Sequence, residues 1–166
     1  VEDVDDPPVI TSSATFAVPE NQTSVGTVTA TDVDSDFLVF SLESDQLNIT
    51  SDGILSFINA PDYEVQTSYT ATVRVTDGIN TVGQDITVSV TNLDDVAPVF
   101  TSSDSFNVAE NQTLVGTISA TDVDTEDSAI VFGLEDPDFV ISSEGELHFV
   151  SAPDYETQQA YSLLIS

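Results

Sequence analysis

The stretch PENQTSVGTVTATDVD at residues 19–34 recurs as AENQTLVGTISATDVD at residues 109–124. The register between the two copies is unbroken, at an offset of 90 residues. Further along the chain, INAPDYE at 58–64 recurs as VSAPDYE at 150–156, now offset by 92 residues because the second copy gains two residues in DTED at 124–127. A self-similarity of this length predicts two copies of one domain in tandem, with the insertion in a surface loop.

Apolar and polar side chains alternate along each copy, as at Tyr69, Ala71, Val73 and Val75. A period of two residues is typical of half-buried strands. Other runs with this period hold Phe16 and Val18, Val28 and Ala30, Leu38, Phe40 and Leu42, Leu55 and Phe57, and Ile86, Val88 and Val90. With Asp-Gly turns at Asp52 and Asp77, about seven short strands in about ninety residues predict an all-β fold of two tandem, immunoglobulin-like Greek-key β-sandwiches without helices.

The second copy ends early. Residues 161–165 match residues 69–73, and the chain stops at Ser166 before the counterparts of 75–92. We therefore expect the second sandwich to lack its last strand in this chain, and we interpret this as a chain boundary. The alternative is that another molecule adds the strand and links chains into a fibre. The predicted domains are residues 1–95, with both linker segments, and residues 96–166.

Charge excludes several classes of function. The chain has 30 acids against one base, Arg74, and a formal net charge of −29. Nucleic-acid binding needs clustered basic residues, and an anionic membrane surface repels such a chain. Without Cys and with a single histidine, His148, the chain has neither disulfides nor a multi-histidine zinc site, and the usual nucleophile and base arrangements are missing. We predict no enzyme activity, and we see no membrane-spanning run or signal peptide.

More than half of the acids lie in motifs that recur or at the junctions between the copies. Two carboxylates about 4 Å apart repel by roughly 4 kcal/mol at an effective dielectric near 20, and this chain has almost no basic side chain to offset that repulsion. The cations must therefore come from solution, either as a diffuse atmosphere or as a hard divalent metal held by converging oxygens. The repeated positions favour the metal.

The pattern resembles tandem cadherin repeats, particularly the bacterial cadherin-like repeats of large surface adhesins. The matching elements are PEN at Glu20, PDYE at 61–64, NLDDVAP at 92–98, ATDVD at 120–124 and VTDG at 75–78. Together they cover essentially the whole chain. The resemblance implies calcium ions between successive repeats, held by the base of one repeat, the linker and the top of the next.

The resemblance assigns metal ligands to three junctions. The complete junction uses Glu20, Asp62, Glu64, Asn92, Asp94, Asp95, Asp122 and Asp124. The half facing a preceding repeat uses Asp3, Asp5, Asp6, Asp32, Asp34 and Asp77, and the half facing a following repeat uses Glu110, Asp154 and Glu156. The family's linker usually reads DxNDN; here Asn92 stands for its first Asp and Val96 for its last Asn. We expect two or three calcium ions at the complete junction.

The function implied is a calcium-binding extracellular repeat module that stiffens a cell-surface adhesin or filament, with the adjacent repeats of the same protein as its partners. Two alternatives stay open. One is a calcium-dependent, self-associating or strand-exchanging fibre subunit. The other is a carbohydrate-binding module, for which Tyr63 and Tyr155 are the candidate stacking residues beside the acids.

Overall fold

Strands and turns build both parts of the chain in the computed structural model, which describes residues 4–35, 37–124 and 129–166. The chain divides into two compact units, Val1–Leu93 and Asp94–Ser166. No α-helix occurs in the described ranges, so none of their segments could cross a membrane as a helix. The predicted all-β sandwich class is confirmed.

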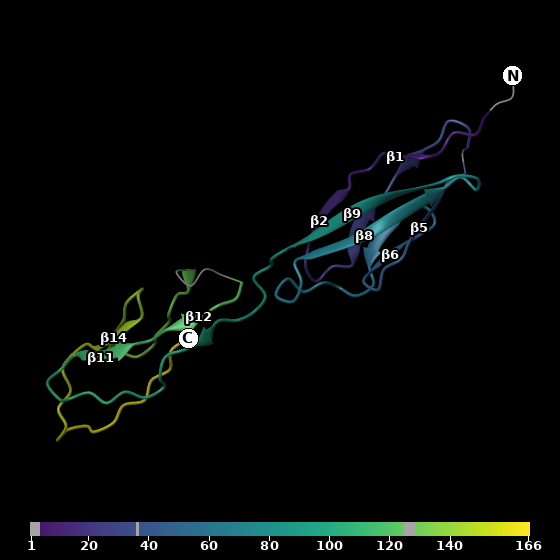
Figure 1. Ribbon diagram of the computed structural model, residues 1–166. Coiled ribbons are helices and arrows are strands. Elements are labelled where there is room, and N and C mark those ends of the chain that lie inside the picture. The colour runs from purple at the N-terminus through teal and green to yellow at the C-terminus, as the bar shows by residue number, and fades with distance from the viewer. Residues whose placement is uncertain (1–3, 36, 125–128) are drawn as a thin grey trace. The chain divides into compact units, whose positions relative to one another are not determined.

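The described residues of the first unit form nine strands, several of which are labelled in Figure 1. They are β1 (Val9–Ile10), β2 (Thr15–Pro19), β3 (Ser24–Thr27), β4 (Ala30–Thr31), β5 (Val39–Leu42), β6 (Leu47–Ile49), β7 (Ile54–Phe57), β8 (Ser68–Thr76) and β9 (Thr81–Thr91). The larger sheet has the order β2-β9-β8-β5, and the smaller sheet has the order β3-β7-β6. β9 lies between β2, with which it pairs in parallel, and β8, with which it pairs antiparallel.

The core of the first unit lies between these two sheets. Val73 on β8, Val88 on β9 and Leu55 on β7 are completely buried. Arg74, next to Val73, faces solvent, as the alternation predicts. The alternation missed the two-residue strand β1, because a strand that short contains no period. Its partner β4 begins at Ala30, which the alternation placed in a strand.

The described residues of the second unit form five strands. They are β10 (Val99–Phe100), β11 (Leu114–Thr117), β12 (Ala120–Thr121), β13 (Phe139–Ile141) and β14 (Glu146–Phe149). The sheet β11-β14-β13 reproduces β3-β7-β6 of the first unit, and β10-β12 reproduces β1-β4. Among its described residues the unit has no counterpart of β9, as predicted. Its small core of Ile118, Phe139, Leu147 and Phe149 is correspondingly open on one side.

A glycine turn in each unit fixes the edge of the smaller sheet. Gly53 has φ +92°, and its carbonyl accepts a 2.8 Å hydrogen bond from the Val28 amide. A Cβ at Gly53 would lie 2.2 Å from the Val28 carbonyl oxygen. Gly145 repeats this arrangement with φ +80° and the Ile118 carbonyl. Only glycine fits where the backbone is left-handed and another backbone comes this close.

Gly53→Ala is therefore expected to destabilise the first unit by about 3 kcal/mol, because it adds a backbone clash to an unfavourable φ. Gly78→Ala is the matched control, since Gly78 has φ +104° but nothing lies within 4 Å of an added Cβ. The control should cost only about 1 kcal/mol. Urea unfolding followed by circular dichroism measures both, and equal losses would show that the contact with Val28 is unimportant.

Candidate metal centres

Glu20 is the one buried charged side chain among the described residues, with 1% of its surface exposed. It directly follows β2, and its amide donates to the Thr91 carbonyl at the end of β9. Its two carboxylate oxygens accept 2.8 Å hydrogen bonds from the amides of Tyr63 and Leu93. This carboxylate therefore holds together the end of β2, the PDYE loop and the residue that precedes the second unit.

The PDYE loop is brought to Glu20 by Asn21. Asn21 has φ 63°, a left-handed conformation that asparagine tolerates, and its amide donates to the Pro61 carbonyl at 2.9 Å. Asp62 folds the loop further, because its carboxylate accepts from the Val65 amide at 3.1 Å. As a result, Glu20, Asp62 and Glu64 each bring a carboxylate oxygen within 4.8 Å of the other two.

The second unit builds the same three-carboxylate group from its own copy of the motifs. Asn111 has φ 61° and donates to the Pro153 carbonyl at 3.0 Å, and Glu110 accepts from the Tyr155 amide at 3.1 Å. Glu110, Asp154 and Glu156 lie within 4.8 Å of one another through their oxygens. Unlike Glu20, Glu110 is exposed.

The other end of the second unit carries a further group. Asp122 and Asp124 follow β12, and the Asp124 amide donates to Asp122 Oδ1 at 2.8 Å. Asp124 Oδ2 accepts from the amides of Asp95 and Val96, at 3.0 and 2.6 Å, which orders the start of the unit. Asp94, Asp122 and Asp124 bring their oxygens within 4.8 Å of one another.

The corresponding end of the first unit repeats these hydrogen bonds. The Asp34 amide donates to Asp32 Oδ1 at 2.8 Å, and Asp34 Oδ2 accepts from the Asp6 amide at 2.7 Å. Asp77 lies in the turn after β8 and, like Asp32 and Asp34, is close enough to repel Asp5. Asp77 Oδ1 accepts from the amides of Ile79 and Asn80 at 2.7 and 2.6 Å.

Two oxygens of this cluster are buried without a donor. Asp32 Oδ2 and Asp77 Oδ2 have no hydrogen-bond partner among the described residues. Desolvation raises the pKa of nearby Asp5, and repulsion from Asp77, Asp32 and Asp34 raises it further, although a hydrogen bond from the Asn80 side chain opposes the shift. Desolvation opposes ionisation of Asp77 as well, but hydrogen bonds from the Ile79 and Asn80 amides and from the Asn80 side chain contribute to a net lowering of that pKa.

Buried carboxylate oxygens that lack a proton donor fit a hard cation, which satisfies them without one. The donors are all oxygens, with no thiolate and no histidine, and this favours Ca²⁺ over Zn²⁺. The residues present therefore fit calcium.

The structure brings most of the predicted ligands into groups. Asn92 follows β9 and is exposed, and Asp95 contributes its amide to Asp124. Asp3 lies outside the described residues, as do residues 125–127 of the DTED insertion.

Sequence reasoning missed Asn80, which donates through its side chain to Asp5 and through its backbone to Asp77. The available signal was the Asp77-Gly78 pair, which is typical of a turn and places Asn80 at the end of that turn.

The first unit has a four-stranded and a three-stranded sheet, and the second unit repeats the three-stranded sheet and the short two-stranded pair. Together with the groups of acidic side chains in both units, this defines a tandem immunoglobulin-like repeat protein of acidic composition. No protein-family profile matches the chain. Cadherin EGF LAG seven-pass G-type receptor 2 of mouse is 35% identical over 160 residues, covering 87% of this chain. Protocadherin Fat 4 of mouse is 31% identical over 175 residues, covering 90% of this chain.

Solved structures of cadherin fragments share the fold of this chain. The EC1-2 fragment of human protocadherin-24 superposes with a TM-score of 0.80 over 98% of this chain and 93% of the fragment, at 20% identity. Drosophila N-cadherin EC1-4 gives a TM-score of 0.79 over 97% of this chain and 45% of its own, at 23% identity. The chain belongs to the cadherin repeat family. The chain spans 6% of the mouse receptor and 3% of Fat 4.

Proposed function

We propose that this chain is a calcium-binding segment of an extracellular protein, in which ions held between successive repeats stiffen the array. The observation that carries the proposal is the pair of donorless, buried oxygens on Asp32 and Asp77 within a cluster of carboxylates. Repetition of the carboxylate groups at equivalent positions of both units supports it. Calcium takes six to eight oxygen ligands, and each acidic loop of this chain offers only two or three carboxylates, so we infer that several loops share each ion.

The residues proposed to hold calcium are those that the sequence assigned. At the junction of the two repeats they are Glu20, Asp62, Glu64, Asn92, Asp94, Asp95, Asp122 and Asp124, binding two or three ions in total. Glu20 accepts from Leu93, and the next residue, Asp94, belongs to the donor group of the second unit. Consecutive residues thus serve both groups, so metal bound there would restrict the backbone that connects the repeats.

Bound calcium supplies positive charge that removes the mutual repulsion of these carboxylates. The backbone amides that hold Asp34, Asp124 and Glu20 orient the oxygens before metal arrives, and this reduces the ordering cost of binding. Extracellular calcium modules bind at about 10⁻⁴ to 10⁻³ M. The calcium sites of the repeats would therefore be occupied outside a cell and empty at cytosolic calcium concentrations.

Asp32→Asn tests the cluster at the start of the first unit. It should weaken calcium binding there about tenfold or more, because an amide supplies one neutral oxygen in place of a charged carboxylate. Asp85→Asn is the matched control: it removes the same charge from the surface of β9, where Asp85 accepts from the Thr72 hydroxyl. Calorimetric calcium titrations of the two variants compare them, and equal affinities would place the ion elsewhere.

Self-association is a second candidate function, favoured by one structural neighbour that is described as a protocadherin gammaB7 EC3-6 cis-dimer. Sedimentation velocity of this chain in calcium and in EDTA tests it. A calcium-dependent dimer would support adhesion or fibre formation. A monomer in both buffers would argue against self-association and leave stiffening as the proposed function.

Carbohydrate stacking gains less support, because Tyr63 is half-buried and packs against the core of the first unit. The adhesin or filament setting, and a bacterial source, rest on the resemblance of the sequence motifs. The curated relatives named above come from mouse.

A further inference from the structure

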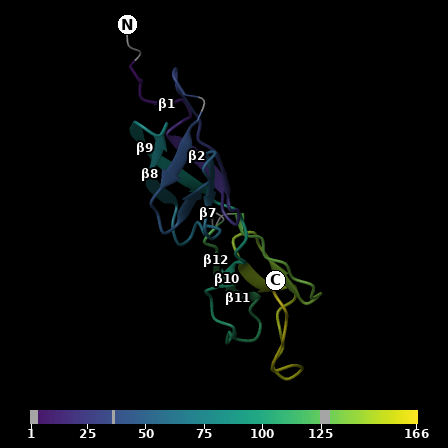
Figure 2. The same cartoon turned by 90° about the vertical axis from the view of Figure 1, so that its right-hand side faces the viewer.

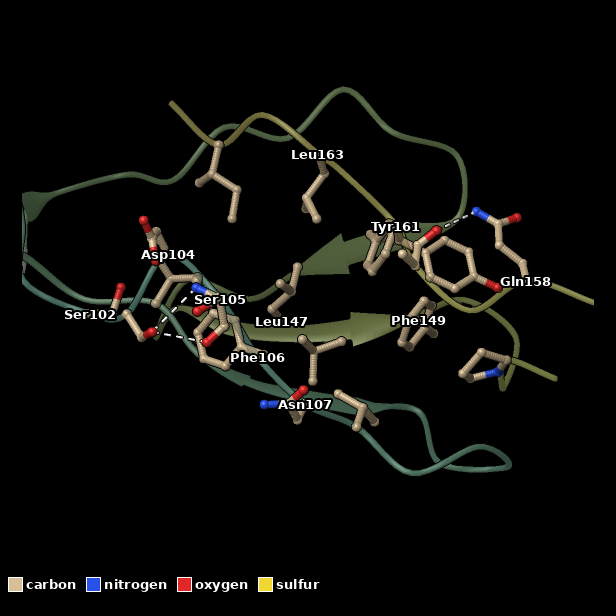
Figure 3. A pocket seen from close by; sticks show the side chains of 18 of the residues that line it. Ser102, Asp104, Ser105, Phe106, Asn107, Leu147, Phe149, Gln158, Tyr161 and Leu163 are labelled. Carbon is tan, nitrogen blue, oxygen red and sulfur yellow. Dashed lines mark hydrogen bonds between the residues drawn. The ribbon is translucent and has the colours of Figure 1, made fainter. Parts of the chain in front are cut away.

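The outer face of the sheet β11-β14-β13 carries the single histidine of the chain, His148. Leu147 and Phe149, the neighbours of His148 on β14, are buried, and their side chains point to the core side of the sheet (Figure 3). Because side chains alternate along a strand, His148 points outward, and Glu146 shares its face. The two side chains lie close together, with 4.0 Å between His148 Nε2 and Glu146 Oε2, and both reach solvent.

Exposed apolar side chains flank the histidine on both neighbouring strands. Leu114 of β11 and Val140 of β13 lie opposite His148, and they are 53% and 51% exposed. The core of the unit lies on the other side of the sheet, so its packing does not use these side chains. Three adjacent strands therefore present one row of Leu, His and Val to solvent. We call this row, together with Glu146, the histidine face.

The first unit shows that the fold does not require an apolar row at these positions. Its sheet β3-β7-β6 has the same strand order as β11-β14-β13, and β3 and β11 have the same irregularity of register. The equivalent row in the first unit is polar throughout and consists of Ser24, Ser56 and Asn48. Since the same sheet forms with either row, the apolar row of the second unit points to a contact outside the domain.

Charge favours a second copy of the chain as the partner at this face. The chain has 30 acidic side chains against Arg74 and His148, so two copies repel each other over most of their surfaces. On the histidine face, a side chain that can become positive lies two residues from a negative one. When two such faces meet antiparallel across a two-fold axis near Leu147, each His148 lies opposite Glu146 of the other copy. The face is therefore complementary to itself.

We propose that the histidine face is a weak, pH-sensitive contact between two copies of this chain. Histidine is the side chain that gains its charge as the pH falls from about 8 to about 5, and carboxylates stay ionised over most of that range. Of the flanking strands, β11 carries no charged residue, and Asp138 directly precedes β13. The contact thus forms in mild acid, through two reciprocal pairs of His148 with Glu146, and weakens at neutral pH.

The histidine face lies apart from the proposed calcium ligands, none of which belongs to it. It gives the second candidate function a surface, and its failure would leave the proposed calcium binding unaffected. Three short strands cover less than the roughly 800 Å² per partner of a standard interface, so the contact is of the weak class. We expect a dissociation constant of about 0.1–1 mM.

Sedimentation equilibrium of the full chain at about pH 5.5 and about pH 7.5 measures the contact. We expect dimers at the lower pH and association at least about fivefold weaker at the higher pH. His148→Ser copies the residue of the first unit and should give monomers at both pH values. His148→Arg keeps a positive charge throughout, so it should dimerise equally at both.

Leu114→Ser and Leu164→Ser form the matched pair of apolar variants, because both leucines are exposed but only Leu114 lies on the histidine face. Only Leu114→Ser should weaken the dimer, by about tenfold. The proposal is overturned if the parent chain is monomeric at about pH 5.5 or associates equally at both pH values. It is also overturned if His148→Ser dimerises like the parent chain, or if the two leucine variants behave alike.

Discussion

Removing calcium with EDTA is expected to lower the melting temperature of the chain by about 10 °C or more. An ion that binds only the folded state stabilises it by about 2.7 kcal/mol when its free concentration is a hundred times the dissociation constant. For domains of this size, 1 kcal/mol corresponds to roughly 4–8 °C. Differential scanning calorimetry with and without calcium measures the shift.

The control for this prediction separates site binding from screening. A chain with a net charge of −29 is stabilised by any salt that screens its self-repulsion. Mg²⁺ at matched ionic strength screens equally, but its demand for near-octahedral coordination and its retained waters suit these multi-carboxylate sites poorly. If Mg²⁺ gives the same melting temperature as Ca²⁺, the acids act as a diffuse charged surface and not as metal sites.

Glu20→Gln is expected to have the largest effect of any single substitution at the proposed sites. It should weaken calcium binding at the junction and also destabilise the first unit in EDTA. The NH2 group of glutamine, which replaces one carboxylate oxygen, cannot accept a hydrogen bond, so the backbone amide of either Tyr63 or Leu93 loses its partner, at a cost of about 1–3 kcal/mol. Relief of repulsion from the exposed Asp62 and Glu64 offsets at most about 1 kcal/mol.

Glu110→Gln is the matched control for Glu20→Gln, because Glu110 occupies the same motif but is exposed, and its carboxylate accepts a hydrogen bond from the Tyr155 amide. In EDTA it should change the unfolding free energy by less than about 0.5 kcal/mol. Urea unfolding of both variants without metal gives the comparison. Equal stability of the two would mean that the buried position of Glu20 is structurally unimportant.

The long strands could be predicted from the sequence because their burial alternates over many residues. β8 and β9, which lie side by side in both views, show this most clearly (Figures 1 and 2). Val73 and Val75 are buried and Arg74 between them is exposed, as the alternation of apolar and polar residues predicts. The two-residue strands β1 and β10 could not be predicted in this way, since tertiary pairing and not local pattern defines them.

The grouping of the acids could be predicted in part. Duplication marked Glu20, Asp62 and Glu64 as a set, and each lies in a loop at a strand end where the fold gathers loops together. Duplication could not show that Glu20 is buried, or that its carboxylate accepts hydrogen bonds from the amides of Tyr63 and Leu93. It also gave no sign of Asn80, because the copy of that residue falls beyond Ser166.

The most direct test of calcium binding is an anomalous difference map from crystals of this chain grown in excess calcium. We expect peaks within coordination distance of the oxygens of Glu20, Asp62 and Glu64, and beside Asp94, Asp122 and Asp124. A well-ordered map without those peaks, in which the same carboxylates point into solvent, would contradict the proposed role.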